Sequence, residues 1–141
     1  MPLKTAPKRA DAKVFLVDDH AVMRAGLVEL INQERGMRVC GEASSAEEAL
    51  QQIPAADAQI VLIDLSLQGT GGLDLLKDLT NRLPDLPVLV LSMHDEAVYA
   101  ERALHAGAKG YIMKDKAIGE LRNAIRRVLS GKIYLSERMS D

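Results

Sequence analysis

The sequence predicts an α/β fold, a doubly wound five-stranded parallel sheet in the flavodoxin-like order 2-1-3-4-5. Strand-like and helix-like segments alternate along the chain. Three of the strand segments are continuously apolar, which is typical of strands covered by helices on both faces, and the other two have the character of edge strands. Right-handed crossovers then place the three apolar strands in the middle of the sheet.

The five expected strands occupy residues 13–17, 38–43, 60–64, 88–91 and 109–113. Segment 38–43 alternates, so that Val39, Gly41 and Ala43 would share one face, and this pattern favours an edge strand. The segment 60–64 reads Ile-Val-Leu-Ile-Asp, an apolar run that ends in a carboxylate. Because ligands bind outside the carboxyl ends of strands in open α/β sheets, Asp64 is a candidate for chemistry.

Five helices follow the strands: four are marked by apolar residues at three- and four-residue spacing, and the fourth is rich in alanine and ends at Gly107. Ser45 and Glu48 form a capping box at the start of the second helix, and Pro54 is expected to end it. Asp95 is expected to cap the fourth helix. The buried stripe of the last helix would consist of Ile118, Leu121, Ile125, Val128 and Leu129.

Composition excludes several classes of protein. The 141 residues carry a formal net charge of -2, so overall basicity does not point to nucleic acid or to an anionic membrane. Cys40 is the only cysteine, which excludes a disulfide within the chain and favours a reducing, cytoplasmic compartment. No apolar run is long enough to span a bilayer. We therefore expect a soluble cytoplasmic protein with no membrane partner.

The two ends of the chain differ in character from the centre. Residues 1–12 contain two prolines and basic side chains without apolar periodicity, and predict a flexible leader. Residues 13–131 are expected to form the folded domain. Residues 132–141 are mostly polar, with a short apolar group at Ile133, Tyr134 and Leu135, and predict the start of a linker to a further domain.

Polar side chains collect at the carboxyl ends of the expected strands: Asp18, Asp19, Asp64, Ser92 and Lys114. Three neighbouring carboxylates repel one another by several kcal/mol at a dielectric constant of about 20, so the cluster predicts a compensating cation. Mg²⁺ fits, because it takes carboxylate ligands and completes its shell with water and phosphate. A lysine and a serine suit phosphoryl oxygens, and an aspartate beside them can act as a nucleophile that forms an acyl phosphate.

Each residue taken alone has a plainer interpretation. A strand-end aspartate can cap a helix or close a turn, and Tyr111 can be a half-buried aromatic residue of an edge strand. His20, His94 and His105 show no metal-ligand spacing and are expected on the surface or in loops, the first two near the mouth of the site. The joint arrangement of five groups at strand ends favours a functional site.

The chain resembles the receiver domains of bacterial two-component response regulators, and within them the NarL/LuxR-type subgroup. The motifs that carry the resemblance are Leu16-Val17-Asp18-Asp19-His20, Ile63-Asp64-Leu65-Ser66-Leu67, Leu91-Ser92-Met93-His94, Gly110-Tyr111-Ile112-Met113-Lys114 and Tyr134-Leu135-Ser136. They extend from about Val14 to Gly131, with the last motif in the tail. One departure is Gln68, which stands where the family usually has proline.

The resemblance implies a role for each residue of the site. Asp64 would accept a phosphoryl group from a sensor histidine kinase, and Mg²⁺ would be bound by Asp18, Asp19, Asp64 and the Ser66 carbonyl. Ser92 and Lys114 would engage the phosphoryl oxygens, and Tyr111 would change rotamer on activation. Ser66 and His94 are expected to tune the lifetime of the acyl phosphate.

The resemblance also implies partners. Phosphorylation would favour a homodimer through the first and last helices, and a helix-turn-helix output domain outside these residues would bind DNA and regulate transcription. The domain would not be a turnover enzyme, since it would catalyse only its own phosphorylation and slow dephosphorylation.

Two other functions compete with this interpretation. A phosphatase of the haloacid-dehalogenase type also combines a strand-end aspartate, a hydroxyl, a lysine and Mg²⁺, but it needs an acid two residues after the nucleophile, where this chain has Ser66. A pure interaction domain with a vestigial acidic pocket is the second, and the retention of all five groups argues against it.

Overall fold

The structure, a computed structural model, describes residues 11–65, 67, 71–93 and 96–136. They form one parallel sheet in the order β2-β1-β3-β4-β5, which confirms the predicted topology. The strands are β1 (Ala12–Val17), β2 (Met37–Ala43), β3 (Ile60–Asp64), β4 (Val88–Ser92) and β5 (Gly110–Met113). The predicted central strands β1, β3 and β4 lie in the middle and the predicted edge strands outside them.

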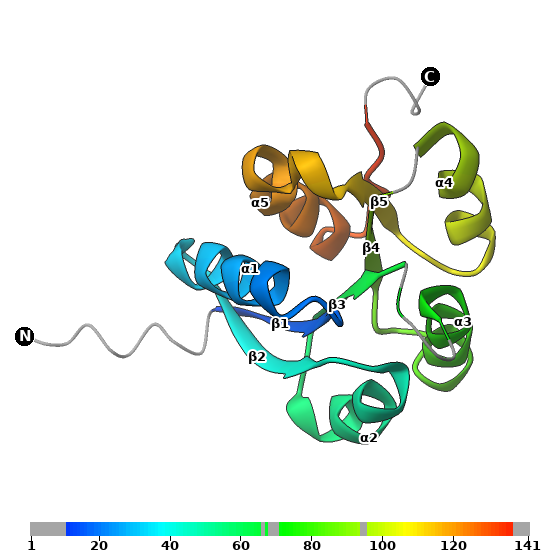
Figure 1. Cartoon of the computed structure of the whole chain (residues 1–141), viewed down its shortest axis with the longest axis horizontal. Coiled ribbons are helices and arrows are strands. Elements are labelled where there is room, and N and C mark those ends of the chain that lie inside the picture. The colour runs from blue at the N-terminus through cyan, green and yellow to red at the C-terminus, as the bar shows by residue number, and fades with distance from the viewer. Residues whose placement is uncertain (1–10, 66, 68–70, 94–95, 137–141) are drawn as a thin grey trace, which may run out of the picture.

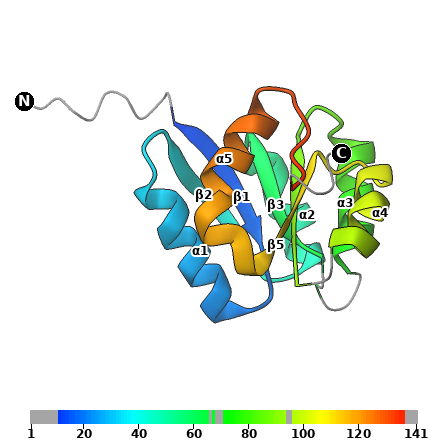
Figure 2. The same cartoon turned by 90° about the horizontal axis from the view of Figure 1, so that it is seen from above.

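Five helices cover the sheet: α1 (Ala21–Gln33), α2 (Ala46–Ala56), α3 (Gly72–Arg82), α4 (Glu96–His105) and α5 (Ala117–Leu129). Helices α1 and α5 lie on one face, and α2, α3 and α4 on the other (Figure 1). The view from above shows the sheet between these two layers (Figure 2). A short 3₁₀ turn, η2 (Lys114–Lys116), joins β5 to α5. No helix in the described ranges combines the length and the apolar character needed to cross a membrane.

The central strands are apolar throughout because both of their faces are covered. All five residues of β3 and of β4 are buried. Successive side chains of β1 go to opposite faces: Phe15 packs beneath α2 and α3, whereas Val14 and Leu16 pack beneath α1 and α5. The sheet therefore has two cores of aliphatic side chains, one on each face.

The alternation predicted for β2 is wrong. Val39 packs on the α1 and α5 face, whereas Ala43 packs on the opposite face. The register with β1 shifts, since Val14 pairs with Val39 but Phe15 pairs with Gly41, so β2 carries one extra residue. Such a bulge changes which face the following side chains occupy. The Phe15 ring takes up the space beside Gly41, where an added Cβ would lie 2.6 Å from its Cε2 atom.

The capping box that opens α2 is confirmed. The Ser45 hydroxyl accepts a hydrogen bond from the Glu48 backbone N–H at 3.1 Å. The Glu48 carboxylate reaches back and accepts from the backbone N–H of Ser44 at 2.7 Å. The hydrogen bonds that the Glu48 carboxylate accepts from the backbone N–H and from the hydroxyl of Ser44 lower the pKa of Glu48.

Pro54 does not end α2, contrary to the prediction. The helix continues to Ala56 with Pro54 in its last turn. Proline there removes one hydrogen bond to the residue four positions earlier, but most of the helix already lies before it. The helix ends at Asp57, whose backbone adopts the left-handed conformation with φ 59° and ψ 37°.

The stripe predicted for α5 is correct except at its first member. Leu121, Ile125 and Val128 are buried, whereas the Ile118 side chain is 84% exposed. Ala117 takes the buried position in the first turn. Ile118 instead borders a groove between α1 and α5.

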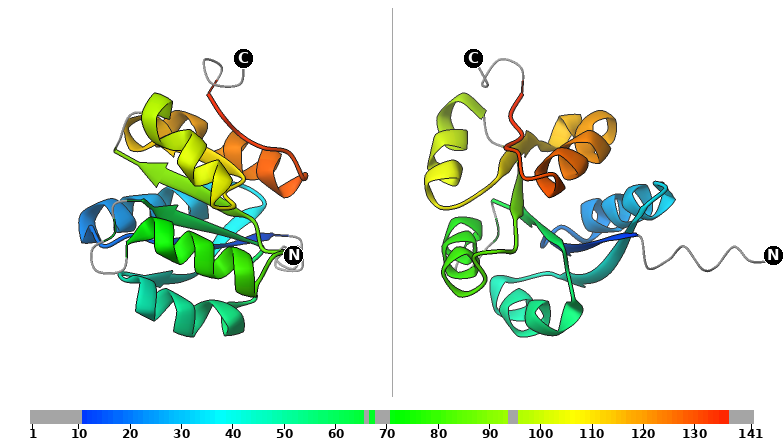
Figure 3. Two further views of the ribbon diagram at one scale, coloured as in Figure 1. Left: turned by 90° about the vertical axis from the view of Figure 1, so that its right-hand side faces the viewer. Right: turned by 180° about the vertical axis from the view of Figure 1, so that it is seen from behind.

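Residues 133–135, expected within the linker, lie against β5. Tyr134 forms a parallel bridge with Gly110: its N–H donates to the Lys109 carbonyl at 2.9 Å, and its carbonyl accepts from the Tyr111 N–H at 3.1 Å. Gly110 permits this approach, since a Cβ there would lie 3.0 Å from the Tyr134 oxygen. Figure 3 shows this segment, in red, leaving α5 and passing beside β5.

Candidate functional site

The site lies where the strands end. Val17 pairs with Ile63 in the sheet, which brings Asp18 level with Asp64, the last residue of β3. Ser92 ends β4, and Lys114 follows β5 directly. The sequence-predicted residues Asp18, Asp64, Ser92 and Lys114 are all buried at this edge of the sheet.

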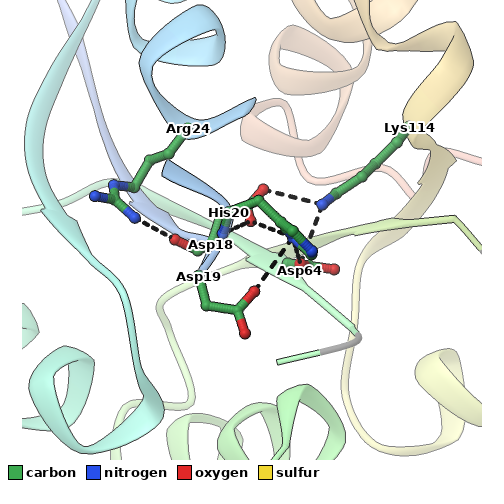
Figure 4. A network of polar contacts seen from close by, with 6 residues as sticks. All are labelled: Asp18, Asp19, His20, Arg24, Asp64 and Lys114. Atoms are coloured by element: carbon green, nitrogen blue, oxygen red, sulfur yellow. Dashed lines mark hydrogen bonds and ion pairs between the residues drawn. The ribbon is translucent and has the colours of Figure 1, made fainter. Parts of the chain in front are cut away.

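A buried lysine bridges two of the carboxylates. The Lys114 Nζ lies 3.0 Å from an oxygen of Asp18 and 3.0 Å from an oxygen of Asp64 (Figure 4). Both aspartates have no exposed surface. Asp19 lies beside them and is partly exposed. One lysine cannot neutralise three carboxylates, so the pocket keeps an excess of negative charge.

His20 covers the mouth of this pocket. Its Nδ1 lies 3.2 Å from Asp18, 3.2 Å from Asp19 and 3.5 Å from Asp64, while 60% of its side chain is exposed. The backbone N–H of His20 also donates to the Asp18 carboxylate at 2.8 Å. Its place at the mouth matches the prediction, but its contact with all three carboxylates was missed. The only signal in the sequence is that His20 follows the acidic pair directly.

Arg24 is a second residue that sequence reasoning missed. It lies on the first turns of α1, and its guanidinium donates to the backbone carbonyl of Asp18 at 2.6 Å (Figure 4). The same guanidinium donates to the Glu42 carboxylate on β2 at 3.1 Å. Arg24 therefore ties the loop that carries Asp18 to the edge strand, and it helps to position the acidic pair.

The chemistry of the donor set fits a hard divalent cation. Asp18, Asp19, His20 and Asp64 each offer a ligand atom, and these atoms all lie within 4.8 Å of one another. Carboxylate oxygens are ligands that Mg²⁺ prefers. The excess negative charge of the pocket gives a cation a favourable electrostatic environment.

The remaining predicted residues are placed as follows. Tyr111 lies on β5 with no exposed surface, beside Val90 in the neighbouring strand, and is thus more buried than an edge position suggests. Ser66 and His94 lie outside the described residues. Gly72 starts α3 against the phosphoacceptor candidate, since a Cβ there would lie 2.5 Å from the Asp64 carbonyl oxygen.

Residues 14–126 match the response regulator receiver domain family, a match that includes most of β1, all of the other strands and every described site residue. The chain belongs to this family of receiver domains. The topology and the strand-end acids agree with this assignment. A receiver domain is part of a signalling protein and not a metabolic enzyme.

Relatives place this receiver domain in the NarL/LuxR-type group. It is 42% identical over 128 residues to the DNA-binding transcriptional activator DevR/DosR of Mycobacterium tuberculosis, covering 89% of this chain and 58% of the relative. It is 36% identical over 128 residues to the response regulator UvrY of Escherichia coli, covering 91% of this chain and 59% of UvrY. The chain thus spans somewhat over half the length of these relatives.

A solved structure supports the same grouping. A two-component response regulator of the LuxR family from an Aurantimonas species superimposes with a TM-score of 0.87 at 33% identity, covering 92% of this receiver domain and 93% of that chain. The receiver fold and the group membership are therefore established at the level of sequence and of structure.

Proposed function

We propose that this receiver domain is a phosphorylation-controlled switch that accepts a phosphoryl group on Asp64 from a sensor histidine kinase. The observation that carries the proposal is the buried Asp64 carboxylate, held at the end of β3 with the Lys114 Nζ 3.0 Å away. A carboxylate in this setting can attack phosphorus, and a phosphohistidine of the kinase would lose its N–P bond as the Asp64 O–P bond forms.

The other residues of the site would have separate roles around Asp64. Asp18, Asp19, Asp64 and the Ser66 carbonyl would hold Mg²⁺, which when bound offsets the charge of the incoming phosphoryl group. Lys114 already contacts the Asp64 carboxylate and would donate to a phosphoryl oxygen. Ser66 and His94, which lie outside the described residues, would tune the slow hydrolysis of the acyl phosphate, as the resemblance to the family implies.

Ser92 and Tyr111 would convert phosphorylation into a change of shape. Ser92 is buried at the end of β4, the strand beside β3, and its hydroxyl would donate to a phosphoryl group on Asp64. Movement of β4 would be passed to β5 because Ser92 pairs with Met113, two residues beyond Tyr111. The buried ring of Tyr111 would then change rotamer.

We further propose that the switch controls transcription through a DNA-binding output domain joined by a linker that follows residues 133–135, and that the protein works in the cytoplasm. The support is that DevR/DosR is a DNA-binding transcriptional activator and extends well beyond the matched region. The present chain has no net positive charge, so DNA binding is assigned to the output domain.

A homodimer through α1 and α5 fits the exposed apolar groups on these helices. Val22 and Ile118 are 88% and 84% exposed and border the same groove between the two helices. Burial of such side chains against a second copy would be favourable. Sedimentation before and after phosphorylation tests this: Ile118→Lys should prevent dimerisation, whereas Ile133→Lys, at an exposed residue that does not line this groove, should not. A receiver that stays monomeric after phosphorylation would contradict it.

The central experiment is intact-mass measurement after treatment with a small-molecule phosphodonor. A single phosphoryl adduct should form with Mg²⁺, fail to form with a chelator, and be labile to hydroxylamine, as a mixed anhydride is. Asp64→Asn should abolish it, while the control Asp115→Asn, an exposed acid beside Lys114, should not. A metal-independent adduct, or an undiminished one in Asp64→Asn, would overturn the assignment.

A further inference from the structure

The imidazole of His20 lies at a distance from each carboxylate that suits joint coordination of one ion. Ligands at neighbouring corners of an octahedron with bonds of about 2.1 Å are about 3.0 Å apart. The Nδ1 of His20 lies 3.2 Å from an oxygen of Asp18 and 3.2 Å from an oxygen of Asp19. An oxygen of Asp64 lies 3.5 Å away. The nitrogen is thus placed as a fourth donor to the acidic pocket, on the side open to solvent.

The local backbone holds His20 in this position. His20 is the residue before α1, and its N–H donates to the Asp18 carboxylate at 2.8 Å. Arg24, one turn into the helix, holds the Asp18 carbonyl at 2.6 Å. Both ends of the short segment from Asp18 to His20 are therefore fixed, and the ring is directed over the three carboxylates (Figure 4).

Imidazole changes which cation the pocket prefers. Mg²⁺ favours oxygen ligands and gives up its waters reluctantly, so it gains little from a nitrogen donor. First-row transition cations accept an imidazole beside carboxylates more readily than Mg²⁺ does; among them Mn²⁺ keeps a preference for oxygen ligands, and the later members favour imidazole most. His20, with 60% of its side chain exposed, can take the place of a water ligand on the solvent side of such an ion.

We propose that His20 is a direct metal ligand that makes this receiver bind a first-row transition cation such as Mn²⁺ more tightly than Mg²⁺. His20 acts on specificity, and the three carboxylates remain the ligands common to both cations. The inference rests on the proposed phosphorylation site only in that both use the same cation pocket.

The test compares His20→Asn with His105→Asn, which makes the same change on an exposed histidine at the end of α4. Asparagine is a favourable residue before a helix, so α1 keeps its start in His20→Asn. Binding of Mn²⁺ is followed by the loss of the free-ion electron paramagnetic resonance signal, and Mg²⁺ binding by competition. Electron spin echo modulation of bound Mn²⁺ reports a coordinated imidazole nitrogen directly.

In the unsubstituted protein and in His105→Asn, bound Mn²⁺ should show the nitrogen modulation. In His20→Asn the modulation should disappear, Mn²⁺ should bind about tenfold more weakly, and Mg²⁺ affinity should stay within about twofold. Nitrogen modulation that survives in His20→Asn would overturn the inference. So would tighter binding of both cations, because the ring would then compete with the metal.

The result also separates this inference from the function proposed above. If the ratio of Mn²⁺ to Mg²⁺ affinity is the same in all three proteins and none shows nitrogen modulation, His20 is not a metal ligand. That result would leave the proposed phosphorylation site intact. A pocket that binds neither cation in any of the proteins would overturn both.

Discussion

The Lys114 ammonium contacts the buried carboxylates of both Asp18 and Asp64, which makes Lys114→Met a sharp test of the site. Methionine keeps the length of the side chain and removes its charge. At 3.0 Å each contact corresponds to an attraction of about 5 kcal/mol at an effective dielectric constant of 20, before desolvation is subtracted. Removing one partner of a buried ion pair costs about 3–5 kcal/mol, because the remaining charge is left buried. We expect Lys114→Met to lower the free energy of unfolding by about 3–5 kcal/mol.

The assay is urea unfolding followed by far-ultraviolet circular dichroism at pH 7, with a chelator present. Lys116→Met is the matched control, since Lys116 lies in the same 3₁₀ turn but is exposed, and it should change stability by less than about 0.5 kcal/mol. Adding Asp64→Asn to Lys114→Met should restore part of the loss, because one buried charge is removed. Mg²⁺ should stabilise Lys114→Met more than the unsubstituted protein. If Lys114→Met unfolds at the same urea concentration as Lys116→Met, the electrostatic reasoning is wrong.

Three further substitutions test the structure around the site and at its periphery. Gly72→Ala places a Cβ 2.5 Å from the Asp64 carbonyl oxygen, so it should cost about 1–3 kcal/mol in urea unfolding and slow phosphorylation of Asp64; unchanged values of both would contradict the contact. Ser45→Ala should cost about 1 kcal/mol by the same assay through loss of the α2 cap, and a neutral effect would show that the cap is dispensable. The hydrogen bond from Lys13 lowers the pKa of Asp57 in the folded state, so its contribution is present above the unfolded pKa and lost as pH falls through the folded pKa. At pH 6, Asp57→Asn should therefore unfold at a lower urea concentration than the unsubstituted protein, and this difference in stability should shrink towards pH 3. A difference in stability that does not change with pH would refute this role of the Lys13–Asp57 pair.

Patterns that depend on neighbouring residues alone were predictable from the sequence. The continuous apolar runs ending at Val17, Asp64 and Ser92 identify central strands, because only strands covered on both faces lack alternation. Once those strands are central, the site follows from topology, since parallel strands present their carboxyl ends at one edge of the sheet. The Ser45 capping box is equally local.

Features decided by contacts between distant residues were not predictable. The shift of register in β2 depends on the ring of Phe15 lying against Gly41, and the exposure of Ile118 depends on how α1 and α5 lie side by side. The contact of His20 with Asp64 joins two segments separated by more than forty positions in the chain. Pro54 illustrates a different limit, since the rule that proline ends a helix does not say in which turn it is tolerated.

The bridge between Gly110 and Tyr134 has a consequence for where the domain can be cut. The backbone of Tyr134 forms hydrogen bonds with the Lys109 carbonyl and the Tyr111 N–H on the outer side of β5. Its hydroxyl donates a further hydrogen bond to Glu120 at 2.8 Å. A chain truncated after residue 131 would leave those two backbone groups open to pairing with a strand of another molecule. Residues 133–135 thus cover this edge of the sheet and prevent its pairing with another molecule, so a stable fragment should retain them.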